Sequence, residues 1–486
     1  MNWKVISRNI GFALLVSALF MLLSVFVSLL SGRDSALAAL SISFLITFTV
    51  GIFPFIFVRE APAITLKEGY VIIFLSWLLS FVFGMLPYAL WGGPFTLQNA
   101  WFESVSGFTT TGATILDNVE GLPNSLLFWR ASTHFIGGLG VVVFLLLVLP
   151  GSNQMKIRLT NMELTSLTRG GYSTRTNKTV YIFAYVYLAL LVLSFIAYLL
   201  AGMPLIDAIC HAMSVSATGG FSSRNTSIAA FDSRWIEGIT MVFMYLSSIH
   251  FGVVYLTVVT RSLKPMTNNP VVRFYTASIV VVALIVGFGL KGNDICHSWG
   301  DALWNGLFET LCVTSTSGFA ILDNAQWPLW IVMVLMFSAV MCGSAGSTSG
   351  GVKVDRMMLL FKSIGRRVNK ILHPSSINEI RLGKRLLRDE EVIPHLFYLN
   401  MYGLFLAVSV ALSLFVGVDH QNSFIASVTS LGNVGPAYGA LGTMGSFNSV
   451  PMLGKLVFTV DMFLGRIEIY PVLAVVAMVF DKRTRE

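Results

Sequence analysis

Four short segments of the chain resemble one another, and each places a glycine in a turn after a short amphipathic run. The central glycines are 108, 98 and 117 residues apart, and each turn lies between two long apolar stretches. A unit repeated four times at this spacing predicts four quasi-equivalent modules around one axis, where a membrane protein could form a pore. The turns are Thr110-Thr111-Gly112-Ala113-Thr114, Thr218-Gly219-Gly220-Phe221-Ser222, Thr316-Ser317-Gly318-Phe319-Ala320 and Asn433-Val434-Gly435-Pro436-Ala437.

The composition excludes an ordinary soluble protein. Hydrophobic residues make up 55% of the chain and charged residues 12%, with a mean hydropathy of +0.75, whereas soluble proteins carry about 25% charged residues. Apolar stretches of about 20 residues predict membrane-spanning helices, so we expect an all-α membrane protein with ten transmembrane helices. The expected spans are 9–30, 36–58, 69–91, 125–149, 179–201, 235–260, 273–290, 329–360, 394–417 and 451–480.

The lysines and arginines predict the orientation of these spans. If both termini are cytoplasmic, 24 of the 32 basic residues lie in cytoplasmic segments, six lie on the outer side, and Lys353 and Arg466 fall at membrane depth. This excess on one side follows the positive-inside rule. The net charge of +8 is therefore explained by topology rather than by nucleic-acid binding. The six outer residues are Arg33, Arg130, Arg224, Arg234, Lys291 and Lys455.

Each of the last eight spans pairs with another across one of the four turns. The runs before the turns, 100–108, 208–216, 306–314 and 424–431, are too short to span and are typical of re-entrant pore helices. The loop after such a helix is tolerated at membrane depth only when it is buried in protein or lines water. We therefore expect four M1–pore-helix–M2 repeats in a pseudo-fourfold arrangement, plus an extra N-terminal helix pair. The predicted units are 1–67 for the pair, then 68–160, 161–265, 266–392 and 393–486 for the repeats.

The turns have the composition of a filter for a monovalent cation. Re-entrant helices direct the negative ends of their dipoles toward the membrane centre, and carbonyls of an extended turn can replace the hydration shell of an ion. Glycine permits the backbone conformations that this requires, and the absence of Asp and Glu from the turns argues against Ca²⁺ or Mg²⁺. The alternative is that the small residues mark close helix packing. The candidate ligands of this cation are the backbone carbonyls of Thr110, Thr111, Thr218, Gly219, Thr316, Ser317, Asn433 and Val434.

The second span of each repeat contains glycine near its middle, at 137–140, 252, 343–351 and 465. The third of these stretches is the longest, and a run of Gly, Ser, Ala and Thr does not form a stable helix facing lipid. Facing a pore, it would form a small and mobile constriction. The residues of this candidate gate are Gly343, Gly346, Ser347, Thr348, Ser349, Gly350 and Gly351.

Two basic residues near the candidate gate have alternative interpretations. Arg466 lies midway through the last span, so it should face water or a partner: it forms a structural ion pair with Asp461 or Glu468, or it serves as an electrostatic barrier under the filter. Lys353 either extends to the cytoplasmic surface or holds the loop across the pore by bonding a carboxylate or carbonyl.

These turns, the ten-span layout and the Gly/Ser stretch resemble the Trk/Ktr/HKT superfamily of potassium transporters, and within it the bacterial TrkH subunits, which have the extra N-terminal helix pair. The resemblance implies a homodimer in the bacterial inner membrane with one potassium pore per protomer. It also implies a cytoplasmic TrkA-like ring that binds the regulatory nucleotide, and no prosthetic group. Residue by residue, it places filter glycines at Gly112, Gly220, Gly318 and Gly435, the intramembrane gate loop at Gly343 to Gly351, and a basic residue below the filter at Arg466.

The predicted function is gated uptake of K⁺, and a proton- or sodium-coupled secondary K⁺ transporter is the alternative. An enzyme is not expected, because no nucleophile-elbow, zincin or paired-aspartate motif is present. The enzymatic alternative is an intramembrane enzyme with Ser347 or Ser349 as nucleophile and His250 as base. The basic linker 361–388 is a candidate contact for the regulatory ring or simply a positive-inside loop.

Overall fold

The computed structural model describes the chain except for residues 59–63, 141–175, 376–378, 383–384 and 481–486. The described residues are mostly helical, but β1 (Ile380–Leu382) and β2 (Arg385–Leu387) form a short antiparallel pair. The expectation of an all-α chain is wrong at this point. Ile380 pairs with Leu387, and both side chains are buried against Leu359 and Val392. This small apolar cluster explains why part of the basic linker is ordered as strands.

The N-terminal helix pair, α1 (Trp3–Leu30) and α2 (Leu37–Phe57), lies at one edge of the molecule. Its connecting turn is tied to the first repeat through Asp34. One carboxylate oxygen accepts hydrogen bonds from Ser28 Oγ (2.6 Å) and Ser125 Oγ (2.8 Å), and the other accepts from the Ser125 amide (3.1 Å). The pair is therefore an addition that packs against the repeats.

The first helix of each repeat is long and apolar, as predicted. Local signals fix where these helices begin: Thr65 and Glu68 form a capping box, Asn269 caps a helix with Pro270 at its first position, and three acidic residues begin the fourth helix. These helices are α3 (Leu66–Gly84) continued by α4 (Leu86–Trp91), α10 (Thr176–Leu200), α15 (Pro270–Gly292) and α19 (Asp389–Phe415).

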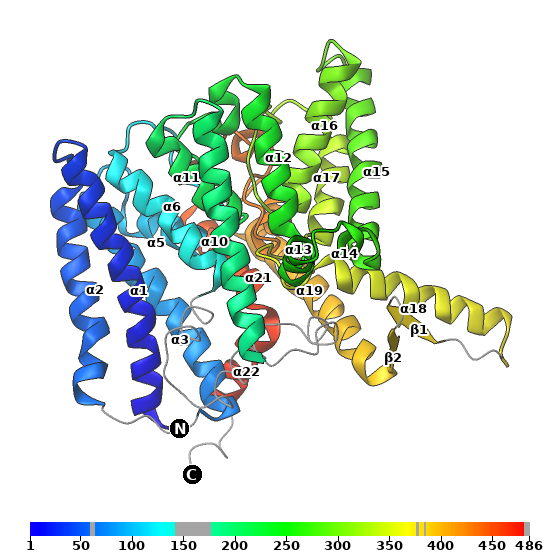
Figure 1. Ribbon diagram of the computed structural model, residues 1–486, viewed down its shortest axis with the longest axis horizontal. Coiled ribbons are helices and arrows are strands. Elements are labelled where there is room, and N and C mark those ends of the chain that lie inside the picture. Colours follow the sequence, from blue (N-terminus) through cyan, green and yellow to red (C-terminus); the bar gives the residue numbers. More distant parts are fainter. Residues whose placement is uncertain (59–63, 141–175, 376–378, 383–384, 481–486) are drawn as a thin grey trace.

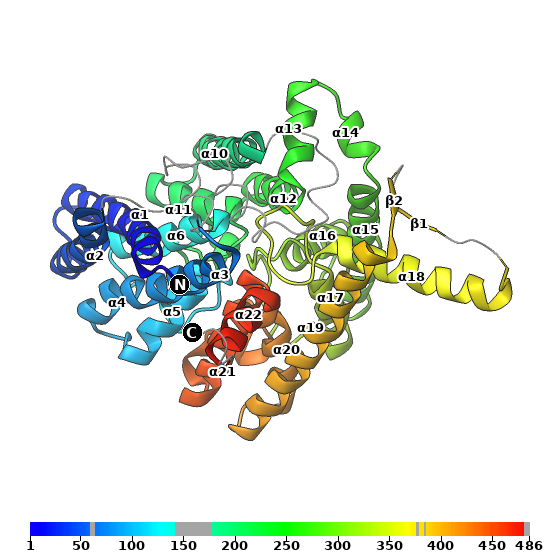
Figure 2. The ribbon, with the colours of Figure 1, turned by 90° about the horizontal axis from the view of Figure 1, so that it is seen from below.

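The four re-entrant helices are present at the predicted positions. Each is short, its C-terminal half is buried, and its C-terminal end meets the predicted turn. Seen from below, the four helices and their neighbours lie around a common centre (Figure 2). The helices are α5 (Leu97–Phe108), α11 (Leu205–Ser216), α16 (Trp299–Thr314) and α20 (His420–Leu431).

The second helices are interrupted. In the described residues, six helices are long and apolar enough to span a membrane, or seven if α12 and α13 count as one span bent by 107°. Of the other second-helix segments in the described residues, α18 has 19 residues but is too charged to span, and the rest have 12–16 residues. The expected span 125–149 runs into 141–175, outside the described residues. The segments are α6 (Asn124–Leu139), α12 (Arg234–Ser248) and α13 (Phe251–Val259), α17 (Leu329–Met341) and α18 (Val354–Leu372), and α21 (Met452–Ile467) and α22 (Ile469–Phe480).

Two predicted breaks lie elsewhere. Gly252 is inside α13, and the break falls just before it, at Ile249 and His250. Gly465 is inside α21, and that helix breaks at Glu468, which has a φ of 69°. Gly465 instead permits close packing, because a Cβ there would lie 2.2 Å from the carbonyl oxygen of Leu431.

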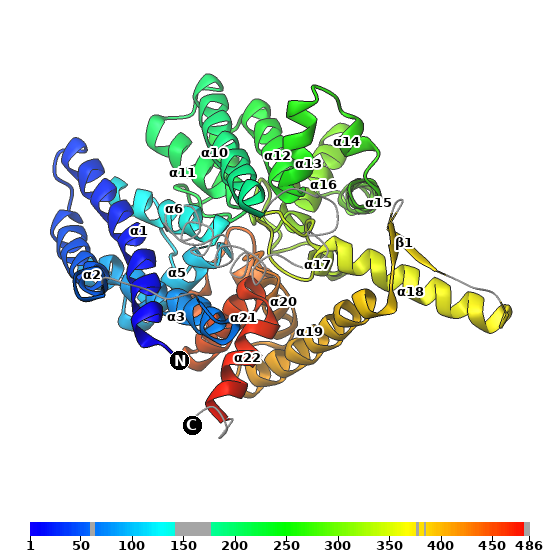
Figure 3. The same cartoon turned by 60° about the horizontal axis from the view of Figure 1, so that its bottom comes forward.

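The start of α1 and the last helix, α22, lie on the same side of the molecule, and α18 projects away from the body (Figures 1 and 3). Four short elements complete the described structure. They are α14 (Lys264–Thr267), η1 (Ser227–Phe231), η2 (Gly439–Leu441) and η3 (Phe447–Ser449).

Candidate ion-conduction site

All four re-entrant helices end in the same backbone motif. The second residue after each helix has left-handed φ, between 53° and 61°, and the next amide donates to the carbonyl five residues earlier. This is a Schellman cap, which satisfies carbonyls that a helix end leaves without partners. The bonds run from Thr111 to Ser106 (2.9 Å), Gly219 to Ser214 (2.9 Å), Ser317 to Cys312 (2.9 Å) and Val434 to Thr429 (2.8 Å).

The left-handed position is occupied by Thr110, Thr218, Thr316 and Asn433. Glycine is the usual residue in such a cap, and a β-branched residue there is a backbone outlier. Strain of this kind costs about 1–3 kcal/mol and persists where the surrounding structure enforces it, often at functional sites. The surrounding structure therefore holds three threonines in a conformation that their side chains disfavour. Asn433, the exception, donates from Nδ2 to Thr111 Oγ1 (3.0 Å) and to the Met462 carbonyl (2.8 Å).

The four central glycines form a closed ring of contacts with the carbonyls of neighbouring turns. Each glycine has a φ between 68° and 95°, and a Cβ on it would collide with a backbone oxygen of the next turn. These contacts join turn to turn rather than helix to helix, and they leave no room for any side chain. The Cβ–oxygen distances would be 2.1 Å from Gly112 to Gly219, 2.2 Å from Gly220 to Ser317, 2.3 Å from Gly318 to Val434 and 2.3 Å from Gly435 to Thr111.

One side of this ring opens into a cavity of about 460 Å³. Gly112, Gly220 and Gly318 line its floor together with Pro436, the residue after the fourth glycine. Its walls come from the loops that follow the turns, mainly residues 440–449 of the last repeat. The amide of Phe447 holds this last loop to the Thr114 carbonyl at 2.7 Å.

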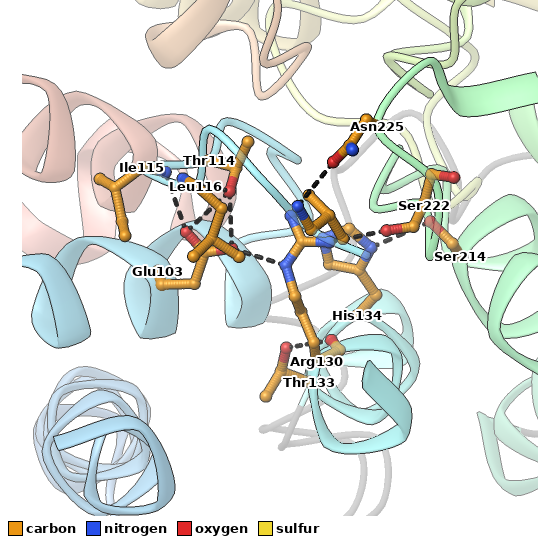
Figure 4. A network of polar contacts seen from close by, with 11 residues as sticks. Glu103, Thr114, Ile115, Leu116, Arg130, Thr133, His134, Ser214, Ser222 and Asn225 are labelled. Carbon is orange, nitrogen blue, oxygen red and sulfur yellow. Dashed lines mark hydrogen bonds and ion pairs between the residues drawn. The ribbon is translucent and has the colours of Figure 1, made fainter. Parts of the chain in front are cut away.

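A buried ion pair connects the first turn to the second (Figure 4). Glu103 of α5 accepts from Arg130 Nε of α6 at 2.6 Å, and the two side chains are 0% and 3% exposed. Glu103 also accepts from Thr114 Oγ1 (3.0 and 3.1 Å) and from the Ile115 amide (3.1 Å). Arg130 Nη1 donates to the Ser222 carbonyl at 2.8 Å. The pair thus fixes the segments that follow Gly112 and Gly220 relative to each other.

Aromatic and imidazole rings pack behind the second turn. The ring of Phe221 stacks on His134 with centroids 4.1 Å apart, and the Arg130 guanidinium lies 3.5 Å from the Phe221 centroid. His134 Nδ1 lies 3.1 Å from Ser214 Oγ, and a Cβ on Gly219 would lie 2.2 Å from that same nitrogen. His134 is therefore a packing residue.

The candidate gate, residues 343–351, lies against the ends of the re-entrant helices. Thr348 Oγ1 donates to the carbonyls of Ser216 (3.2 Å) and Ser247 (3.1 Å). Ser349 Oγ donates to the Ser315 carbonyl at 2.8 Å. The Gly350 amide donates to Thr316 Oγ1 at 3.1 Å, and a Cβ on Gly350 would lie 2.6 Å from Asn433 Cβ. The loop therefore contacts the second, third and fourth repeats at the level of the strained caps.

Within the loop, Gly346 and Gly351 have positive φ (80° and 65°), and a Cβ on Gly343 would lie 2.4 Å from Ser349 Oγ. Ser347 Oγ donates to the Ser344 carbonyl at 2.6 Å, and His250 caps α13 by accepting from the Gly252 amide at 2.9 Å. These bonds give the serines and His250 structural roles.

Arg466 and Lys353 both bond carbonyls of the gate region. Arg466 Nη1 donates to Thr348 (2.6 Å), and Nη2 donates to Gly137 (2.5 Å) and Gly138 (2.8 Å) at the end of α6. The loop is thus also joined to the first repeat. Lys353 Nζ donates to the Ser349 carbonyl, which is the second of the two alternatives for this residue.

The acids proposed as partners of Arg466 bond other groups. Asp461 accepts from Ser409 Oγ. Glu468 pairs with Arg356 Nη2 at 2.9 Å, and the Arg356 guanidinium lies 3.8 Å from the Tyr398 centroid.

Arg130 and Arg356 were not recognised from the sequence as site residues, because both were counted only as topology markers. Each is about 3% exposed, and each has an acidic partner. The signal that could have identified Arg130 is a charge inside an apolar span combined with Glu103 in the preceding pore helix.

Long apolar helices and four buried re-entrant turns around one centre define a multi-pass membrane protein. A family model described as TrkH, a cation transport protein, matches residues 39–484. The chain therefore belongs to the TrkH family of cation transport proteins.

Individual relatives match over nearly their full length. The Trk system potassium uptake protein TrkH of Salmonella typhimurium (strain LT2) is 31% identical over 486 residues, covering 99% of both chains. The Trk system potassium uptake protein TrkG of Escherichia coli (strain K12) is 30% identical over 478 residues, covering 97% of both. The crystal structure of the potassium transporter TrkH from Vibrio parahaemolyticus matches with a TM-score of 0.88 and 30% identity, covering 100% of both chains.

Proposed function

We propose that this protein takes up K⁺ through a single pore in each protomer, with the ring of turns as its selectivity filter. The observation that carries the proposal is the closed series of contacts between each filter glycine and the carbonyl of the next turn. The relatives' names, potassium uptake proteins, supply the ion. The proposed ligands are the carbonyls of Thr110, Thr111, Thr218, Gly219, Thr316, Ser317, Asn433 and Val434.

Electrostatics support a monovalent cation at this ring. Four helix C-termini, each equivalent to roughly half a negative charge, converge on it. No carboxylate belongs to the turns, so the field is too weak to favour a divalent ion over its hydration shell. Neutral carbonyls that replace water around K⁺ allow the ion both to enter and to leave.

The loop at residues 343–351 is the proposed gate. Its hydroxyl and amide donors occupy the Ser216 and Ser315 carbonyls and Thr316 Oγ1, and these oxygens lie at the negative helix ends. A hydrated cation leaving the filter would use the same oxygens. The loop and the ion therefore compete for one set of acceptors, and releasing the loop opens the path.

Regulation by a cytoplasmic ring is part of the proposal. The helix α18 follows the gate loop directly, and the Ala345 amide donates to Asp355 Oδ2 at the start of this helix (2.6 Å). Beyond it, α18 carries Arg367 and Lys370, both exposed. A TrkA-like ring that binds this helix could transmit nucleotide binding to the loop, so no nucleotide or prosthetic group need bind this chain.

We further propose the bacterial inner membrane as the location, with both termini cytoplasmic, four pseudo-fourfold repeats and ten passes through the bilayer. The start of α1 and the helix α22 lie on the same side of the molecule. The predicted excess of basic residues on the side of the two termini supports this orientation. The homodimer and the unit boundaries given above stay predictions.

Rubidium uptake into proteoliposomes tests the proposal. Gly112→Ser should let Na⁺ compete with Rb⁺, because the new Cβ would displace the Gly219 carbonyl. Gly92→Ser is the matched control: Gly92 has the same φ of 81°, but a Cβ there would meet nothing within 4 Å. Uptake should follow a membrane potential set without a pH or sodium gradient. Unchanged discrimination in Gly112→Ser contradicts the filter, and dependence on a proton or sodium gradient supports coupled transport instead.

A further inference from the structure

An apolar groove of about 690 Å³ lies beside the bend between α12 and α13, apart from the ring of turns. Tyr245 of α12, Met266 of α14, and Val272, Ala277 and Val281 of α15 line it. Its volume is within the range of about 300–1,000 Å³ typical of small-molecule sites. Figure 2 shows α13, α14 and α15 running outward from the body and back. Val280, one of its lining residues, is 49% exposed, so the groove is open on the exposed apolar side of α15, which is the surface that a bilayer covers.

One basic residue, Arg273, lines this groove, and two more, Arg261 and Lys264, lie in the chain segment that leads to it. Arg273 is among its lining residues and is held there by donating to the Thr267 carbonyl and to Asn268 Oδ1 (3.3 Å). Arg261 and Lys264, in the segment between α13 and α15, are exposed. The sequence from residue 238 to residue 293 contains no Asp or Glu, so this segment supplies no carboxylate to neutralise them.

We propose that the groove binds an anionic glycerophospholipid, with an acyl chain along its apolar lining and the phosphate at Arg261, Lys264 and Arg273. An apolar channel that faces the hydrocarbon and ends in cations at the membrane surface has the chemistry of a lipid site. A soluble metabolite would not reach a groove that opens toward the bilayer, whereas a lipid supplies both an acyl chain for the apolar lining and an anion for the cations.

The groove wall connects to the loop at 343–351 through a short chain of contacts. The Tyr245 ring stacks on Tyr275, with centroids 6.1 Å apart and planes 10° apart. Tyr275 Oη donates to Ser248 Oγ (2.9 Å), and the Ser248 carbonyl accepts from the Ser344 amide (2.8 Å). The bound lipid therefore braces the end of α12 against the loop. This regulatory consequence, unlike the binding site, rests on the proposed gating function.

Native mass spectrometry of the full chain, extracted from vesicles of phosphatidylcholine with phosphatidylglycerol, tests the site. The wild type should retain phosphatidylglycerol in preference to phosphatidylcholine. Lys264→Gln with Arg273→Gln should reduce that retention by roughly tenfold or more, as expected for the loss of two cations near a lipid phosphate. The matched control removes two exposed charges from α18, Arg367→Gln with Lys370→Gln, and should retain the lipid. Equal retention by all variants, or no preference for the anionic lipid, overturns the proposal.

A second pair of variants tests the groove without changing charge. Ala277→Trp fills it, whereas Leu284→Trp adds the same ring to α15 outside the lining residues. Only Ala277→Trp should lose the lipid. If it instead lowers the dimer fraction with lipid retention unchanged, the groove is a contact between copies, and the proposal is overturned. The regulatory consequence predicts that phosphatidylglycerol changes rubidium flux of Leu284→Trp but not of Ala277→Trp. If the lipid binds but does not change the rubidium flux, the binding site is supported and its proposed effect on the gate is refuted.

Discussion

Removing one hydroxyl from the gate loop tests whether the loop closes the path below the filter. Ser349 Oγ donates to the Ser315 carbonyl at 2.8 Å, and Ser349 is 1% exposed. In the closed state, Ser349→Ala leaves the Ser315 carbonyl without this donor. In the open state the substitution changes nothing at that carbonyl, because water bonds it once the loop has left. The substitution should therefore destabilise the closed state selectively.

The magnitude follows from the single bond. A neutral intramolecular hydrogen bond contributes about 0.5–1.5 kcal/mol net, which corresponds to a shift of about 2- to 12-fold in the closed–open equilibrium. While the closed state dominates, the open fraction rises by the same factor. Rubidium flux into proteoliposomes without any partner, normalised to the reconstituted protein, should rise within that range.

Ser338→Ala is the matched control. Ser338 is also 1% exposed and also donates to a backbone carbonyl, that of Leu335 at 2.7 Å, but this bond stays inside α17. Its flux should equal that of the wild type. Flux in Ser349→Ala that is unchanged or reduced, at normal expression and thermal stability, would refute the proposal that these bonds hold a gate closed.

Four further substitutions, one of them a control, test the surrounding structure. Glu103→Gln leaves Arg130 buried without its charged partner, so it should destabilise the fold by about 3–5 kcal/mol and lower the preference for K⁺ over Na⁺. The control is Glu309→Gln: the carboxylate of Glu309 accepts the Ile321 amide at 3.5 Å, and its loss should destabilise the fold much less in thermal denaturation. Equal destabilisation by the two variants would contradict the role of the pair. Glu468→Gln weakens the ion pair between Glu468 and Arg356 of α18, the helix that follows the gate loop, and should raise basal flux. Reduced flux would contradict a role of this pair in keeping the loop in place. Thr110→Gly relieves the strain of the left-handed backbone at this position, about 1–3 kcal/mol. It should raise the melting temperature and lower the discrimination between K⁺ and Na⁺. A fall in both the melting temperature and the discrimination would show that Thr110 is not strained for the sake of function.

The re-entrant helices and their turns could be predicted because their signal is repeated. Four amphipathic runs aligned on Gly112, Gly220, Gly318 and Gly435 each strengthen the others, and all four helices end next to the expected turn. The left-handed φ of Thr110, Thr218 and Thr316 could not be predicted, since threonine disfavours that conformation and only tertiary packing enforces it.

Breaks in the second helices were predicted less well, because glycine permits a break without requiring one. Gly465 stays helical since its lack of a side chain admits the Leu431 carbonyl, while the actual break at Glu468 is held by the ion pair to Arg356. The strands near Ile380 depend on contacts with α18 and α19 that no local pattern records.

The most direct test of the central claim is the anomalous scattering of rubidium bound to the protein in crystals. The account predicts the strongest peak on the axis of the ring, among the carbonyls of Thr111, Gly219, Ser317 and Val434, and a weaker one in Gly112→Ser. A strongest peak at acidic side chains away from the ring, in protein that transports rubidium, would contradict the filter assignment.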